Sequence, residues 1–176
     1  MATAQQAITP EFALSLRQMM LDGLMGELEI TKKVLAAIPD DKRDYRPDPN
    51  ARTAWELAVH IANSDVQFLD AIADLKFDMG AQEHKPNNVV ELVAWYDENF
   101  KRAAGRLRAM SAEQLMTPID FVGAFNFPAV VYLGFLNNHC IHHRGALATY
   151  LRPMGAKCPS IYGGSYDEPW QGAQAA

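Results

Sequence analysis

Apolar residues recur at steps of three and four along four separate stretches of the chain. This spacing places side chains on one face of an α-helix. No stretch between turn residues keeps the apolar–polar alternation that predicts a strand. We therefore predict helices from about Pro10 to Ile38, from Thr53 past Ile72, from about Asn88 to Met110 and from about Pro128 to Leu151.

Polar residues at the predicted helix starts support these limits. Thr53 and Glu56 have the spacing of a capping box, in which each side chain binds a free backbone N–H of the first turn. Asn88 is followed by Glu91 in the same way, and Ser111 is placed to cap a short turn after the third helix. The periodic stretches therefore begin where helix capping is available.

Each predicted helix has one apolar face, which it must bury against the other helices. The chain is thus expected to be all-α, a four-helix bundle in a single domain over residues 1–176, with an irregular tail from about 153 to 176. The connections are longer than usual between antiparallel neighbours, so one or more is expected to cross over the bundle. The predicted faces comprise Phe12, Leu16, Met19, Met20, Leu24 and Leu28; Leu57, Ile61, Ser64, Phe68 and Ile72; Leu92, Tyr96, Phe100, Ala103, Leu107 and Met110; and Val131, Phe135, His139, His143, Ala146 and Tyr150.

Composition narrows the classes of function. A chain of 176 residues can bury a core without disulfides, and its net charge of −5 disfavours binding to nucleic acid or to an anionic membrane. No apolar run approaches the roughly 20 residues of a membrane-spanning helix. With only two cysteines, no CxxC spacing and no secretion-signal pattern in the first residues, we expect a cytoplasmic location.

Three of the five histidines fall on inward positions of two predicted helices. His139 and His143 are four residues apart, so their rings leave one helix on the same side, and His60 lies beside Leu57 and Ile61. Imidazole nitrogens bind zinc at about 2.0–2.1 Å, and three histidines are an established ligand set. We therefore predict that His60, His139 and His143, the histidine triad, hold one divalent metal ion.

The alternative is that each histidine is an ordinary core residue with its own hydrogen-bond partner, since an HxxxH spacing alone arises often by chance. Against this, an unpaired buried polar group costs about 1–3 kcal/mol, and one shared ion satisfies all three rings. A three-histidine site without a fourth protein ligand leaves room for water or substrate, as catalytic zinc sites do. This pattern does not specify a reaction.

Four further residues near the triad have simpler interpretations. His142 is predicted to lie on the helix surface, and Cys140 to be a small buried residue. His84 lies in a predicted loop and receives no role. Asp65 is interpreted as an exposed helix residue, the alternative being a group that orients a ligand histidine.

Two segments resemble the DinB/YfiT-like family of metal-binding four-helix bundles: HCIHHRGALATYLRPMGAKCPSIYG, from His139 to Gly163, and TAWELAVHIANSDVQFLDAI, from Thr53 to Ile72. The resemblance implies an up-down-down-up bundle with the long crossover between the second and third helices. It implies the histidine triad as the metal ligands, zinc or nickel as the metal, and a homodimer.

The same resemblance implies transfer of a low-molecular-weight thiol, such as bacillithiol, to an electrophilic small molecule; a mycothiol-dependent isomerase also belongs to this group. The partners expected are thus a small-molecule substrate and a second copy of the chain, with no nucleic acid and no membrane. Two alternatives stay open. One is a non-enzymatic stress-response protein that holds metal or a ligand, and the other is a metal-dependent hydrolase, which needs a nearby carboxylate as general base.

Overall fold

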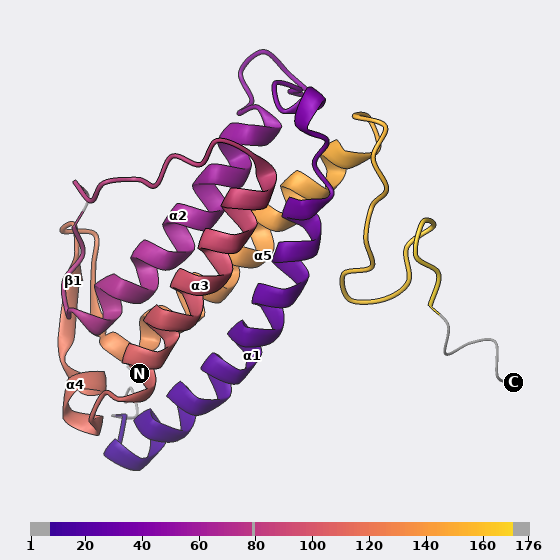
Figure 1. Ribbon diagram of the computed structural model, residues 1–176. Helices are drawn as coiled ribbons and strands as arrows, with labels where there is room; N and C mark the ends of the chain where they lie inside the picture. The colour runs from indigo at the N-terminus through magenta and orange to yellow at the C-terminus, as the bar shows by residue number, and fades with distance from the viewer. Residues whose placement is uncertain (1–7, 79, 171–176) are drawn as a thin grey trace, which may run out of the picture.

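The computed structural model describes residues 8–78 and 80–170, and it is mostly helical (Figure 1). Two predictions fall partly or wholly on residues 1–7 and 171–176, which lie outside the described residues: that the first residues lack a secretion-signal pattern, and that the end of the tail is irregular. The elements are α1 (Pro10–Ala36), the 3₁₀ turn η1 (Asp40–Lys42), α2 (Ala54–Ala73), α3 (Val89–Arg108), α4 (Ala112–Met116), β1 (Pro118–Phe121), β2 (Phe125–Pro128), the 3₁₀ turn η2 (Ala129–Val131) and α5 (Tyr132–Leu151).

The four long helices form an up-down-down-up bundle, as expected. In Figure 1, α1 and α5 run in one direction and α2 and α3 in the other, so the connection between α2 and α3 returns along the length of the bundle. Each of α1 and α2 packs against both α3 and α5, which places α1 and α2 on a diagonal. The crossover follows α2, because Asn63 donates to the backbone oxygen of His84 and Gln67 to that of Gln82.

The predicted capping residues begin their helices. Thr53 and Glu56 form a complete capping box, in which Glu56 accepts from the Thr53 N–H at 2.7 Å. Asn88 accepts from the N–H of Glu91 at 2.8 Å, and Ser111 caps the short helix α4. These local contacts satisfy backbone donors that a helix start leaves free, so sequence alone could locate them.

The predicted buried faces are confirmed in full for α3 and in part for α1. All six predicted residues of the third face are buried. On α1, Leu24 and Leu28 are buried as predicted. The prediction is wrong for Phe12 and Met19, which have 55% and 65% of their surface exposed. The apolar residues of α1 cover a wide arc of the helix, so more than one row of them has helical spacing. The row that is buried begins at Ala13 and not at Phe12.

The face predicted for α5 is also displaced. Phe135 is exposed, and the buried row comprises Tyr132, Leu133, Leu136, Cys140, Arg144, Leu147, Tyr150 and Leu151. His139 and His143 are half-buried beside this row. The histidines therefore lie at the edge of the core and not in its centre. At the edge, solvent or a ligand can reach them.

A short hairpin contradicts the prediction that the chain has no strands. β1 and β2 pair antiparallel, with Ile119 opposite Phe127, and Pro128 ends β2 instead of starting the fourth helix. Strands of four residues are too short to show a period. The hairpin is attached to α5 by the hydroxyl of Tyr132, which donates to the backbone oxygen of Ile119 at 2.7 Å.

The tail after α5 contains no helix or strand up to residue 170, as predicted. Its Tyr162 hydroxyl donates to Glu27 of α1 at 2.7 Å and contacts Arg144 of α5. Arg144, only 1% exposed, also pairs with Glu27, so the tail is connected to a buried charge.

None of the helices in the described ranges is long and apolar enough to cross a membrane.

Candidate metal centre

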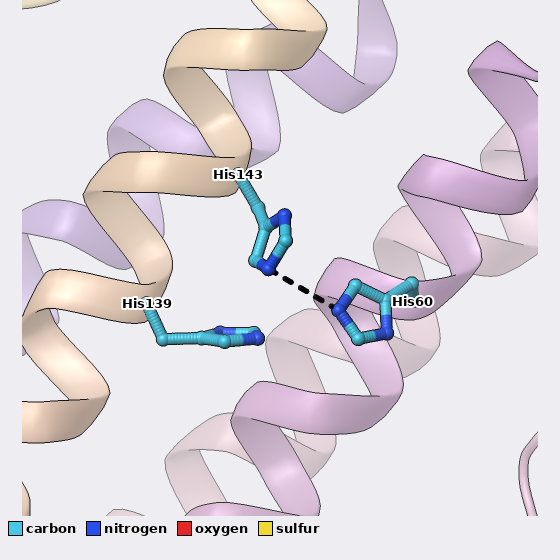
Figure 2. Close-up of side chains that lie close together, drawn as sticks. All are labelled: His60, His139 and His143. Atoms are coloured by element: carbon cyan, nitrogen blue, oxygen red, sulfur yellow. Dashed lines mark hydrogen bonds between the residues drawn. The ribbon is translucent and has the colours of Figure 1, made fainter. Parts of the chain in front are cut away.

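The structure brings the three predicted ligands together across the interface of α2 and α5. His60 projects from α2, and His139 and His143 project from successive turns of α5 toward it (Figure 2). Nε2 of His60 and Nε2 of His143 are 3.3 Å apart, and one nitrogen from each ring lies within 4.8 Å of the others. Residues 83 positions apart in sequence thus share one site.

Two of the rings are oriented through their other nitrogen. Nδ1 of His60 lies 3.0 Å from the hydroxyl of Ser64, one turn further along α2. Nδ1 of His139 lies 2.9 Å from Oδ1 of Asp65. An ionised carboxylate only accepts, so this contact places the proton of His139 on Nδ1 and leaves its Nε2 lone pair free. Such contacts hold a ligand histidine in the required tautomer.

The interpretation of Asp65 as an exposed residue was wrong, because its side chain has no solvent exposure. Its second oxygen accepts from the Tyr96 hydroxyl of α3 at 2.8 Å, and Tyr96 is itself fully buried. Burial, together with the charge of Asp65, raises the pKa of Tyr96 and that of Cys140 well above their usual values. Both groups therefore stay protonated and surround the carboxylate with neutral donors.

The environment keeps two of the ligand rings neutral. Burial is the main cause that lowers the pKa of His60 to about 4, with smaller contributions from Arg52 and His139. Burial also lowers the pKa of His143 to about 4, assisted by the neighbouring histidines. A metal ion binds the unprotonated ring, so at neutral pH these ligands lose no proton when they bind one.

One pair of nitrogens in the triad has the separation expected at a tetrahedral divalent ion. Two nitrogens at about 2.05 Å from zinc and at a tetrahedral angle are roughly 3.3 Å apart, which matches the separation of the His60 and His143 nitrogens. Within residues 8–78 and 80–170, no fourth histidine, cysteine or carboxylate joins the group. The residues thus suit an ion with a coordination position left for a small molecule.

Cavities lie on both sides of His60. One, of about 430 Å³, is called here the charged cavity, because Arg52, Glu56 and Lys85 border it beside apolar residues such as Trp55. The other, of about 270 Å³, reaches His60 and His139 and is bordered by three phenylalanine rings. Small molecules can therefore approach the triad from a charged side and from an apolar side.

The residues around the triad match their predicted environments only in part. His142 is exposed and Cys140 is buried, as predicted. His84, in the crossover, stacks on Trp95 of α3 at a centroid distance of 4.5 Å. Ser64 and Tyr96 lie on the predicted apolar faces, but the structure gives both polar contacts that the spacing does not predict. Ser64 could have been found, since it lies one turn after His60, but nothing in the sequence linked Tyr96 to Asp65.

Comparisons with known proteins agree with this architecture. The chain is 28% identical to the uncharacterised protein YjoA of Bacillus subtilis over 74% of this chain and 86% of YjoA. The crystal structure of that DinB-like protein superposes with a TM-score of 0.68 at 23% identity, over 81% of this chain and 97% of the other. A DinB-like protein from Bacillus cereus gives 0.69 at 24% identity, over 81% and 95%.

These structural likenesses establish the fold, and the sequence match extends over most of the chain. Residues 16–173 match the model of the DinB family. The matched range contains the whole histidine triad and both segments on which the resemblance was based. The chain therefore belongs to the DinB family.

Proposed function

We propose that the protein binds one divalent metal ion, zinc or nickel, and uses it to transfer a low-molecular-weight thiol to an electrophilic small molecule. The observation that carries the proposal is the convergence of three half-buried imidazoles beside cavities on two sides. A structural ion needs no such access. A site open toward two cavities suits a reaction between two small molecules.

A bound divalent ion lowers the pKa of a coordinated thiol, which increases the fraction of nucleophilic thiolate at neutral pH. In the proposed reaction, the thiol proton passes to solvent and a new sulfur–carbon bond forms. The bond from that carbon to its leaving group breaks, and the leaving group departs with the electron pair. The chain supports this by holding three imidazole rings in place and by orienting His139 through the buried carboxylate of Asp65.

The charged cavity is suited to a hydrophilic thiol. Its border includes the positive charges of Arg52 and Lys85 and the negative charge of Glu56. Trp55 adds an aromatic ring to the same cavity. A thiol that carries amino, carboxylate or hydroxyl groups can make ionic contacts there while its sulfur reaches the triad.

The contacts of two carboxylates, Asp65 and Glu56, argue against the hydrolase alternative, which needs a carboxylate free to act as general base. Asp65 already accepts from His139 and Tyr96, and it is enclosed behind the ring of His139. Glu56 already accepts from the Thr53 N–H in the capping box. Both carboxylates already accept hydrogen bonds within the chain, which counts against either of them as the general base.

The first test is the metal content of untagged protein by elemental analysis, for the wild type and for His139→Ala/His143→Ala. We expect close to one ion per chain in the wild type and its loss in the double variant. His142→Ala is the matched control, since this exposed histidine lies on the same helix and should leave the content unchanged. Wild-type protein that stays metal-free with zinc or nickel supplied would overturn the proposal.

The second test is turnover of metal-loaded protein with a panel of small thiols and electrophiles, followed by thiol consumption and product mass. Thioether formation that requires both the thiol and the ion supports transfer. Full metal occupancy without turnover on any pair supports the non-enzymatic alternative, a protein that holds metal or a ligand. The expected homodimer is a separate prediction, which sedimentation analysis would check.

A further inference from the structure

The apolar cavity beside the triad has walls made of three aromatic rings from different parts of the chain. Phe68 comes from α2, Phe77 from the start of the crossover and Phe121 from the end of β1. The centroids of Phe68 and Phe77 are 5.0 Å apart, and those of Phe77 and Phe121 are 4.8 Å apart. The rings meet edge to face, which is a favoured aromatic arrangement and gives the cavity defined sides.

The other boundary of this cavity is the metal centre itself. His60 and His139 border it, together with Ser64. A molecule inside would have aromatic rings along its body and ligand imidazoles at one end. Only a ligand that is apolar along most of its length and polar at one end matches both surfaces.

We propose that this cavity is the binding site for an aromatic group of the electrophilic substrate, with the reactive carbon directed at the triad. The inference rests on the proposed function and names the class of its second substrate: a single aromatic ring that bears an electrophilic carbon. The hydrophilic thiol occupies the charged cavity on the opposite side of His60. The two reactants therefore meet at the histidine triad from opposite sides.

The size of the cavity agrees with this class. Benzene fits an apolar protein cavity of about 150 Å³, and the cavity here measures about 270 Å³. One ring with a short reactive substituent fits this space. Two further polar residues, Gln67 and Asp78, lie at the border. The Gln67 amide donates to the backbone of Gln82 and the Asp78 carboxylate accepts from the N–H of Gly80, so both already have partners within the chain.

The inference can be tested by ligand binding, without turnover. The full chain is loaded with Co²⁺, whose visible spectrum reports both occupancy and thiolate binding. Phenylmethanethiol and 2-mercaptoethanol are then titrated separately. Both bind an ion through sulfur, so the ratio of their affinities reports the contact of the ring with the protein. We expect phenylmethanethiol to bind roughly 10-fold tighter or more.

Variants then assign the preference to this cavity. Phe121→Ala should reduce the ratio several-fold while the cobalt spectrum persists, and Phe77→Ala provides the same test from a different segment if the first variant fails to fold. Phe125→Ala is the matched control, because this residue lies in the same hairpin, is exposed and does not border the cavity. Its ratio should equal that of the wild type.

The outcomes separate this inference from the proposed function. Cobalt binding with equal affinities for the two thiols overturns the aromatic site alone. A preference that survives both phenylalanine variants also overturns it, because the ring would then bind elsewhere. Absence of any cobalt spectrum overturns the metal-dependent function, and this inference with it.

Discussion

Asp65 and His139 form a contact that connects the histidine triad to the interior of the bundle. Oδ1 of Asp65 lies 2.9 Å from Nδ1 of His139, while Oδ2 accepts from Tyr96. The carboxylate thus links α2 to both α5 and α3, and it fixes the direction of one ligand ring. A hydrogen bond to the far nitrogen of a ligand histidine also increases the basicity of the nitrogen that binds the metal.

Asp65→Asn should weaken metal binding by about 10–100-fold, the usual effect of losing such a partner. The amide keeps the shape of the side chain but removes the charge that favours the Nδ1–H tautomer of His139. Competition against a chelator of known affinity measures the change. Asp70→Asn is the control, since Asp70 lies on the same helix and pairs with Arg102 and Arg106 instead. Equal affinities for Asp65→Asn and wild type would contradict the role assigned to this carboxylate.

The metal-free protein should lose stability as the pH falls from about 6.5 to about 4. In the folded state the pKa of His60 and that of His143 are lowered to about 4 from an unfolded value of 6.5. The unfolded chain therefore binds more protons in this pH window, so protonation favours unfolding. The stability that the two neutral rings contribute is fully present only above the unfolded pKa of 6.5 and is lost as the pH falls toward 4. Thermal melts of chelator-treated protein across this range measure the effect.

Carboxylates elsewhere also titrate near the lower end of that range, so a variant is needed for comparison. His60→Gln/His143→Gln removes both rings and should give a flatter dependence of melting temperature on pH between about 6.5 and 4. If the variant and the wild type show the same slope, the two histidines are not responsible.

Glu27→Ala should destabilise the protein by about 3–5 kcal/mol, because it leaves a buried guanidinium without its ion-pair partner. Arg144 is 1% exposed and has Glu27 as its carboxylate partner. Tyr162→Phe removes only a hydroxyl from the same cluster and should cost about 1 kcal/mol. Urea unfolding of each variant measures both values. A Glu27→Ala loss as small as that of Tyr162→Phe would show that Arg144 is adequately solvated.

Thr53→Ala should cost about 0.5–2 kcal/mol, the usual value for loss of an N-cap hydroxyl. The Thr53 hydroxyl accepts from the N–H of Glu56 at 3.1 Å, at the start of the helix that carries His60. Thr53→Ser keeps the hydroxyl and serves as the control in the same unfolding experiment. Equal stability of the alanine and serine variants would mean that the cap contributes nothing.

Local patterns were sufficient for most of the fold. Helix starts depend on contacts within one turn, so Thr53, Asn88 and Ser111 could be recognised as caps from their neighbours alone. The buried face of α3 was also predictable, because its apolar row is bordered by charged residues on both sides. In α5, apolar residues occur on several sides of the helix, so periodicity alone allows more than one buried face. The predicted face contains His139, whereas the face that is buried contains Cys140.

The pairing of His139 and His143 was predictable from the chain, because residues four apart share one side of a helix whatever surrounds them. His60 joins them in the structure, and binding of a metal by this triad stays a prediction. The environment of the three residues was not predictable. The burial of Asp65, its contact with Tyr96 and the aromatic cavity all depend on how α2, α3, α5 and the hairpin pack. Side-chain contacts between segments tens of residues apart arise from packing of the whole bundle, and no local pattern encodes them. The chain thus specifies which groups can bind a metal, and the tertiary structure specifies how they are oriented and what can reach them.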